Sequence, residues 1–327
     1  MKKIQYAVWK KETNNAGGKA KNDAFDIVEK LGFEPSYQPA EKRMMRVMQQ
    51  YRSMHKFDDA DIIFMQYPAV DFRILPSFLK HISPKQNSIA LIHDLRSIQG
   101  SGTEEDVAEI PFLNHFRYVI AHNRFMGTFL KENGYTGTVV HLDLFDYLHD
   151  AGRAIMSSRG DGSVAFAGNL VKSTFINDLG SLSDTRFILY GNKGDNDFST
   201  MENVEYKGSL PSDEIVYKLE GDYGLVWDGD SVDTCSGKNG EYLRYNNPHK
   251  LSLYIAAGKP VITWSQAAIA EFVKDNQIGI VVDSLKDLDR LDLKEHYSEL
   301  KNNVLKLKEK VAEGYYLSQA MEKCCGQ

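Results

Sequence analysis

A helix start in the second half of the chain carries two basic residues. Asn247 is a typical N-cap residue and Pro248 suits the first helical position, which places His249 and Lys250 in the first turn. N–H groups there are free and the helix dipole attracts anions, so a cation in this turn opposes the dipole. The sequence therefore favours a phosphate or diphosphate ligand beside Lys250. A lysine that extends into solvent is the alternative.

A second candidate is the segment Phe166–Ser173, in which a predicted strand runs into a turn of small residues before a helix. Gly168 permits close approach of a ligand to the backbone, and Lys172 is long enough to reach a phosphate. An ordinary strand-to-helix turn explains the same residues and remains open.

A third candidate is the acidic loop that follows the predicted strand Tyr223–Trp227. Asp228 and Asp230 can accept hydrogen bonds from sugar hydroxyls, with Trp227 as an apolar wall. Carboxylates at this spacing also suit Mg²⁺ or Mn²⁺, but a cation would be redundant beside a phosphate site already lined by lysines. A solvated loop is the third possibility. We expect no metal site.

In the first half of the chain, His93 and Asp94 follow the predicted strand Ser88–Ile92. An imidazole or carboxylate at the carboxyl end of a central strand suits a general base, provided that it reaches the attacking group. The alternative is that both residues only cap and orient the loop.

Two glycine-rich segments complete the candidate residues. Gly17 and Gly18 are predicted to form a turn before a helix, and Gly100, Ser101 and Gly102 a loop on the acceptor side. Neither segment has the GxGxxG or Walker pattern, so the sequence supports no dinucleotide or ATP site.

Short apolar runs alternate with segments of helical spacing, which predicts parallel sheets with helices on both faces. The predicted strands are Ile4–Trp9, Asp61–Met65, Ser88–Ile92, Tyr118–Ala121, Thr138–Leu142, Ser163–Ala167, Arg186–Tyr190, Tyr223–Trp227, Pro260–Trp264 and Ile278–Val282. The predicted helices are Lys19–Leu31, Phe72–His81, Glu104–His115, Arg124–Asn133, Ser212–Glu220, Pro248–Ala257 and Ala267–Lys274, with further helical spacing over Leu293–Glu322. We expect two doubly wound α/β domains at 1–150 and 151–308, a linker over Phe145–Gly162, and a C-terminal helix at 309–327 that packs back on the first domain. A ligand crevice is expected between the carboxyl ends of their strands.

Composition narrows the function further. The 327 residues include 39 Lys and Arg against 45 Asp and Glu, and this net charge of −6 argues against a nucleic-acid binder that works by bulk charge. Three cysteines without a CxxC pair exclude a disulfide scaffold and suit a reducing cytosol. The basic N-terminus has neither the apolar core nor the small-residue cleavage site of a signal peptide, so we expect none, and no apolar run is long enough to span a bilayer.

The segment Glu41–Phe57 combines five cations with methionines at helical spacing. Such a basic amphipathic helix can rest on anionic lipid, which would give peripheral membrane contact. A domain helix with a solvated basic face is the alternative.

Three sequence blocks carry a resemblance to a known family. GLVWDGDSVDTCSG, YLRYNNPHKLSLYIAAGKPVI and AAIAEFVKDNQIG closely resemble the bacterial β-1,6-galactofuranosyltransferases of O-antigen (lipopolysaccharide) and capsular polysaccharide synthesis. The segments GGKAKNDAFDI, LIHDLRSIQGSG, VIAHN and FAGNL extend the likeness along the chain. A more distant similarity is to the streptococcal glucosyltransferases that extend adhesin glycans.

This resemblance implies a GT-B fold, UDP-α-galactofuranose as donor and a lipid-linked glycan as acceptor. It assigns the residues Asn247, Pro248, His249, Lys250, Leu251 and Ser252, with Gly168, Asn169 and Lys172, to the diphosphate, and His93 and Asp94 to the crevice. One position departs from the broader GT-B pattern, because Leu253 and Tyr254 stand where many such enzymes have a ribose-binding glutamate.

The implied reaction is a metal-independent, inverting displacement that needs no cofactor besides the donor substrate. Lys250 and Lys172 would stabilise the departing UDP, and Asp94, or less favourably His93, would take the proton of the hydroxyl. Other UDP-hexose donors, a UDP-sugar epimerase and a non-catalytic nucleotide-sugar-binding partner of a transferase are the rival functions. We expect a cytoplasmic protein, at most peripheral at the plasma membrane, and the sequence is compatible with a homo-oligomer.

Overall fold

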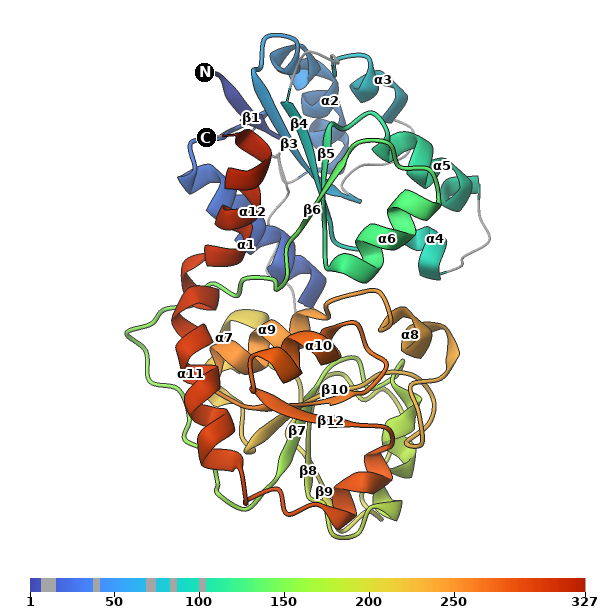
Figure 1. The fold of residues 1–327 in the computed structure, drawn as a ribbon, viewed down its shortest axis with the longest axis vertical. Coiled ribbons are helices and arrows are strands. Elements are labelled where there is room, and N and C mark those ends of the chain that lie inside the picture. The colour runs from blue at the N-terminus through green and yellow to red at the C-terminus, as the bar shows by residue number, and fades with distance from the viewer. Residues whose placement is uncertain (7–15, 38–41, 69–74, 83–86, 100–103, 327) are drawn as a thin grey trace. The chain divides into compact units, whose positions relative to one another are not determined.

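The computed structural model describes residues 1–6, 16–37, 42–68, 75–82, 87–99 and 104–326 (Figure 1). The chain divides into two compact units. The first unit holds the described residues within Met1–Lys11, Ala20–Asp143 and Gly314–Gln327, and the second those within Glu12–Lys19 and Leu144–Glu313. The divisions thus fall after Asp143 and after Glu313, where the sequence-based expectation placed them after residues 150 and 308.

The first unit is built on a parallel six-stranded sheet with the order β2-β1-β3-β4-β5-β6. Its strands are β1 (Lys3–Gln5), β2 (Glu34–Pro35), β3 (Ile62–Tyr67), β4 (Asn87–Ile92), β5 (Tyr118–Ala121) and β6 (Thr138–His141). Tyr67 pairs with Ile92, so the residues that follow β3 and β4 emerge together at the same edge of the sheet. The central strands are buried almost throughout, as expected of a sheet covered on both faces.

The helices of this unit are α1 (Ala16–Lys30), α2 (Arg43–Ser53), α3 (Leu75–Leu79), α4 (Arg96–Gln99), α5 (Glu104–Leu113), α6 (Arg124–Glu132) and α12 (Tyr315–Cys325), with the 3₁₀ turn η1 (Met54–Phe57). Helix α6 begins where Asn123 accepts hydrogen bonds from the N–H groups of Phe125 and Met126. Helix α12, from the end of the chain, packs against β4 and β6.

The second unit holds another parallel six-stranded sheet, in the order β12-β11-β10-β7-β8-β9. Its strands are β7 (Val164–Ala167), β8 (Phe187–Tyr190), β9 (Val204–Tyr206), β10 (Tyr223–Val226), β11 (Val261–Trp264) and β12 (Gly279–Val282). Its helices are α7 (Ser212–Lys218), α8 (Gly237–Tyr242), α9 (His249–Ala256), α10 (Ile269–Asp275) and α11 (Tyr297–Glu313), with the 3₁₀ segments η2 (Thr174–Ser181) and η3 (Leu285–Arg290). Helix α9 packs against β10 and β11, and α11 covers α9.

The predicted doubly wound α/β architecture is confirmed by these two sheets. Strands β2 and β9 were not predicted from the sequence, because two or three residues at a sheet edge show no periodic pattern. None of the described helices is both long and apolar enough to cross a membrane.

Two connecting regions differ from expectation. The C-terminal segment is not one helix, because Gly314 adopts a left-handed φ of 80° between α11 and α12. A Cβ at Gly314 would also lie 2.7 Å from Cγ1 of Ile27. Both the backbone conformation and the close contact therefore favour glycine at this position. The predicted linker over 145–162 has no helix or strand, yet Phe145 and Tyr147 are buried in it. These aromatic side chains anchor the segment to the second unit.

Candidate active site

The strand order of the second sheet marks one place for a ligand. From β7 the chain proceeds to β8 and β9 on one side, and from β10 to β11 and β12 on the other side. Loops that leave β7 and β10 therefore diverge, and in open α/β sheets a ligand binds in the opening at the carboxyl ends of such strands. The residues that follow Ala167 and Val226 lie at this junction.

Lys250 extends over this junction from the first turn of α9. Its Nζ lies 3.3 Å from Oδ2 of Asp228 and 3.5 Å from the carbonyl oxygen of Trp227. The ammonium also stands 4.6 Å from the centre of the Phe166 ring, a cation–π distance. With its side chain 16% exposed, Lys250 does not extend into solvent. The structure thus brings together residues from all three segments that the sequence singled out.

Asp228 is held in place by three donors. One carboxylate oxygen accepts hydrogen bonds from the Ser173 hydroxyl and the Gly229 N–H, each at 3.0 Å, and the other faces Lys250. Burial alone would raise the pKa of Asp228, but the charge of Lys250 and these hydrogen bonds outweigh it and lower the pKa. Asp228 is therefore ionised at neutral pH, and it neutralises Lys250 in this structure.

The turn after β7 lies on the other side of the Lys250 side chain. A Cβ at Gly168 would lie 3.0 Å from Cε of Lys250, so glycine makes room for the lysine chain as well as for a ligand. Asn169 does not present its carbonyl group to the site, because Oδ1 accepts hydrogen bonds from the N–H groups of Val171 and Lys172. The Lys172 side chain is exposed on the outer part of the turn.

Helix α9 begins one residue later than predicted. Pro248 is the N-cap, with an extended ψ of 135°, so His249 and not Pro248 is the first helical residue. The predicted cap by Asn247 is wrong, and Asn247 is buried. Lys250 still lies in the first turn, where the N–H groups of His249 and Lys250 precede the first intrahelical hydrogen bonds.

His249 does not face the junction as a cation. Its ring stacks on Tyr147, with ring centres 5.0 Å apart, and its Nε2 lies 3.2 Å from the carbonyl oxygen of Asp146. Burial lowers the pKa of His249 to about 3, so the ring is neutral and cannot neutralise a phosphate. Leu251 and Ser252 are fully buried as well. Of the predicted diphosphate-binding turn, Lys250 alone combines charge with access.

In the acidic loop after β10, Trp227 and Asp230 make hydrogen bonds within the loop itself. The Trp227 ring is fully buried and its indole N–H donates to the carbonyl oxygen of Ser231, so the ring forms no accessible wall for a sugar. Asp230 is exposed and accepts a hydrogen bond from the Ser236 hydroxyl. A buried tryptophan and a solvated one cannot be told apart in sequence, which is why the wall was expected.

Tyr254 explains the departure from the ribose-binding pattern. Its hydroxyl accepts from the N–H of Ala167 at 2.9 Å and donates to the carbonyl oxygen of Leu225 at 3.1 Å. The side chain thus bridges β7 and β10 where these strands separate. Gly224 fits beneath it, since a Cβ there would lie 2.1 Å from the tyrosine ring. Tyr254 therefore has a structural role, which its place in the sequence did not predict.

In the first unit, His93 and Asp94 follow β4, as predicted. His93 is buried, and its Nε2 lies 2.7 Å from Oε1 of Gln66. Because that oxygen only accepts, Nε2 carries the proton, and the lone pair of the neutral ring is on Nδ1. Asp94 is exposed, with Gln99 3.4 Å from its carboxylate. Burial of Lys21 lowers the pKa of its ammonium group, and the nearby charge of Asp94 partly offsets this effect. The assignment of Asp94, or less favourably His93, as the general base stays a prediction.

Two residues that the sequence did not single out, Glu109 and His122, support this edge of the sheet. Glu109 is fully buried and accepts hydrogen bonds from the N–H groups of Arg96 and Ser97, which fixes the start of α4 just after Asp94. His122 follows β5, donates to the carbonyl oxygen of Ile92, and has its pKa lowered by burial to about 4. A buried acid or imidazole shows no sequence signal that separates it from an exposed one.

The predicted acceptor-side segments are only partly described. Gly17 and Gly18 lie in the first turn of α1 and not in a turn before it, and they group with the second unit. Gly100, Ser101 and Gly102 lie outside the described residues.

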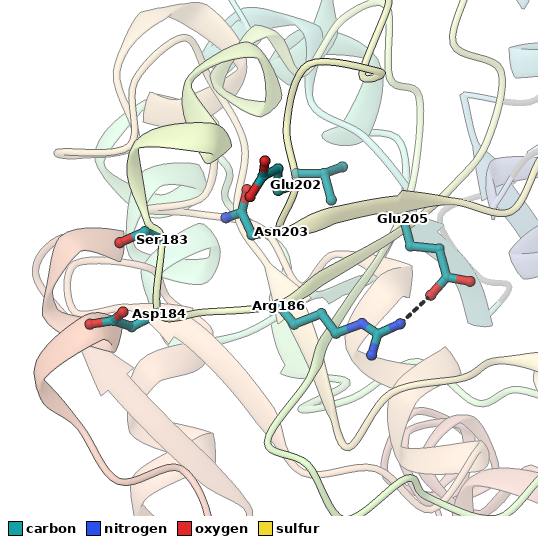
Figure 2. A pocket seen from close by; sticks show the side chains of 7 residues that line it. Ser183, Asp184, Arg186, Glu202, Asn203 and Glu205 are labelled. Carbon is teal, nitrogen blue, oxygen red and sulfur yellow. Dashed lines mark hydrogen bonds and ion pairs between the residues drawn. The ribbon is translucent and has the colours of Figure 1, made fainter.

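A cavity of about 590 Å³ in the second unit is not at the predicted site (Figure 2). It is lined by residues before β8 and β9, among them Arg186, whose Nη2 donates to Oε2 of Glu205 at 2.9 Å. These are the amino ends of the strands, opposite to the edge where α/β sheets bind ligands. Across the described ranges, no three His, Cys, Asp or Glu side chains are grouped as metal ligands would be.

Comparison with known proteins gives this geometry its context. The model of the glucosyltransferase 3-like N-terminal domain matches residues 4–144, and that of the C-terminal domain matches residues 164–324. The beta-1,6-galactofuranosyltransferase WbbI of Escherichia coli (strain K12) is 32% identical over 324 residues, which cover 94% of each chain. This chain belongs to the glucosyltransferase 3-like family of glycosyltransferases. Glucosyltransferase 3 of Streptococcus gordonii is 33% identical over 123 residues, about a third of each protein.

Solved structures confirm the predicted GT-B fold of this family member. AviGT4, a glycosyltransferase of avilamycin A biosynthesis, is 12% identical, with a TM-score of 0.57. The match covers 100% of this chain and 99% of AviGT4. Anabaena HepE in complex with UDP-glucose is 10% identical over 99% of this chain and 98% of its own, with a TM-score of 0.59. The predicted resemblance to galactofuranosyltransferases, and more distantly to streptococcal glucosyltransferases, is also confirmed.

Proposed function

We propose that this glycosyltransferase transfers galactofuranose from UDP-galactofuranose to a hydroxyl group of a growing glycan, with inversion at the anomeric carbon. The donor rests on the relative in E. coli, whose name states a β-1,6-galactofuranosyltransferase and which aligns along nearly the whole of both chains. The observation that carries the binding site is Lys250, placed over the junction of β7 and β10 beside Gly168 and Asp228.

In the proposed reaction, the bond from the anomeric carbon to the UDP oxygen breaks as the bond to the acceptor oxygen forms. Negative charge then grows on the β-phosphate. Lys250 is the cation that meets this charge, together with the first N–H groups of α9, and Lys172 is a second phosphate contact from the exposed turn. With these positive groups, the proposed transfer requires no metal ion.

The acceptor hydroxyl must lose its proton as it attacks. We assign this proton to the Asp94 carboxylate, which is exposed at the end of β4. His93 is a positioning residue in this scheme, because its ring is buried and hydrogen-bonded to Gln66. Asp228 and Asp230 are proposed to face the hydroxyls of the donor sugar.

The proposed acceptor is a lipid-linked glycan of surface polysaccharide synthesis, and the proposed location is the cytoplasm. This acceptor rests on the resemblance of the sequence to galactofuranosyltransferases of O-antigen and capsular polysaccharide synthesis, a resemblance that the E. coli relative supports.

The test is a donor screen. The full chain is incubated separately with UDP-galactofuranose, UDP-galactopyranose and UDP-glucose, with and without hexoside acceptors, and the products are identified by mass spectrometry and NMR. A β-linked galactofuranosyl disaccharide formed from the first donor supports the proposal. Preferential transfer of glucose would identify the donor of the streptococcal relatives instead, and sugar interconversion without acceptor would identify an epimerase. A chelator is included in a parallel series, and loss of transfer on chelation would refute the metal-independent scheme.

A further inference from the structure

Helix α2 of the first unit directs its apolar side chains away from the protein. Met44 is 76% exposed, and Met45, Met48 and Tyr51 are about half exposed. Because successive residues turn by about 100° in a helix, Met44, Met48 and Tyr51 form one stripe along its outer side. Four of the eleven large apolar side chains that the described residues expose therefore lie on this one helix. Scattered exposed apolar residues are ordinary, but such a cluster marks an interaction surface.

The opposite side of α2 is polar and faces the protein. Gln50 donates to the Tyr37 hydroxyl at 3.1 Å, and Ser53 is buried and donates to the carbonyl oxygen of Gln50. Val47 packs against the core at the margin of this side. A helix that only covered a core would show the reverse pattern, with its methionines inward. Folding of the unit therefore does not use the apolar stripe.

The charge around the stripe indicates what covers it. The segment 41–57 has five cations and one acid, a net charge of +4 in a chain whose net charge is −6, and the exposed Asp58 and Asp59 follow it. Arg52 and Lys56 are exposed, as is Lys42 just before the helix. A symmetric contact with a second copy would place this positive patch against the same positive patch, which is unfavourable. An anionic lipid surface matches both the positive charge and the long, flexible apolar side chains.

We propose that α2 is an interfacial helix that binds anionic lipid bilayers. Met44, Met48 and Tyr51 enter the boundary between headgroups and acyl chains, while Lys42, Arg52 and Lys56 contact lipid phosphates. The inference deepens the proposed function, since a bilayer surface would present a lipid-linked acceptor. It can nevertheless be measured without sugar transfer, so the two proposals fail separately.

The experiment is cosedimentation of the full chain with vesicles of phosphatidylglycerol and phosphatidylcholine in equal parts, and with vesicles of phosphatidylcholine alone. The test variant is Met44→Ser/Met48→Ser/Tyr51→Ser. The matched control is Met156→Ser/Leu291→Ser/Leu305→Ser, which removes three side chains of similar exposure from the second unit. We expect binding to the anionic vesicles that the test variant weakens at least tenfold and the control leaves unchanged. Replacing Arg52 and Lys56 with Gln should weaken it about fivefold per charge.

Melting temperature verifies the fold of each variant, which should not change because these side chains leave the core intact. Equal vesicle binding by the test variant and the control would overturn the proposal, as would equal binding to both kinds of vesicle. Wild-type protein that ignores vesicles but self-associates through α2, with the test variant monomeric in analytical ultracentrifugation, would identify a second copy as the occupant. Transfer to a soluble acceptor should be the same in the test variant and the wild type, which separates membrane binding from catalysis.

Discussion

The ion pair between Lys250 and Asp228 allows the proposed donor site to be tested with two substitutions that should act in opposite directions. Lys250→Met removes the cation but keeps a side chain that can lie over Phe166. Asp228→Asn keeps the shape of the carboxylate but releases Lys250 from its counter-ion. A pair that serves only the fold would respond similarly to either change. A pair in which the lysine binds diphosphate should not.

The geometry sets the expected magnitudes. At 3.3 Å and an effective dielectric constant of about 20, the attraction between the two charges is on the order of 5 kcal/mol before the cost of desolvating them. After that cost, the net value of a partly exposed pair is about 1 kcal/mol or less. A charged hydrogen bond to a ligand contributes about 1.5–3 kcal/mol, so Lys250→Met should weaken UDP binding about 10- to 150-fold. Asp228→Asn should tighten it about two- to fivefold, because Lys250 no longer has to leave a partner.

The assay is isothermal titration calorimetry with UDP, supported by thermal unfolding of each variant. UDP is used without a sugar, so that a loss of contacts from Asp228 to sugar hydroxyls does not enter the result. Lys301→Met is the matched control, because Nζ of Lys301 also stands over an aromatic ring, 5.5 Å from the centre of Tyr297. Its UDP affinity should equal that of the wild type.

Two results would refute this reasoning. If Lys250→Met and Asp228→Asn weaken UDP binding to the same extent, the pair acts through the fold. If Lys250→Met binds UDP as well as Lys301→Met does, the nucleotide is held elsewhere.

The remaining predictions concern catalysis, packing and pH. Asp94→Asn should lower kcat about 10²- to 10⁴-fold with the donor KM nearly unchanged, and most of the activity surviving in steady-state assays would place the base elsewhere. Tyr254→Phe should lower the free energy of unfolding by about 1–3 kcal/mol, measured in urea, because the N–H of Ala167 loses its partner; an unchanged midpoint would contradict the bridge between strands. Burial lowers the pKa of His249 from 6.5 to about 3, so between these values the unfolded chain binds the extra proton and stability falls as the pH falls, by at most about 1.4 kcal/mol per pH unit. His249→Gln should flatten this dependence in urea titrations at pH 6.5 and 5, and an identical slope would show that His249 is not its source.

Much of the fold follows from local pattern. Runs such as Ile62–Phe64 and Ile89–Ile92 are too apolar for a surface strand, and their alternation with helical segments predicted the parallel sheets. The edge strand Val204–Tyr206 was not predicted, because only its neighbour in space makes it a strand. The break at Gly314 was also missed, because the helical spacing continues on both sides of this glycine, whose left-handed φ of 80° separates α11 from α12.

In the candidate site too, one residue could be predicted from the sequence and its partners could not. Lys250 was identified because a cation in the first turn of a helix is unfavourable beside the helix dipole. Both the helix start and the lysine can be recognised in the sequence. Its partner Asp228 and the ring of Phe166 are set by the junction of two strands that are far apart along the chain. The role of Tyr254 as a bridge between strands has the same origin.

By itself, the sequence determined the alternation of the central strands with helices, the acidic balance of the chain, and the residue types available to bind phosphate and accept a proton. Tertiary structure alone decided which of them are charged and accessible. It buried His249 and Trp227, fixed His93 on Gln66, and turned the methionines of α2 outward. The physical reason is that residue type and helical spacing are local properties, whereas desolvation depends on everything that packs around a side chain.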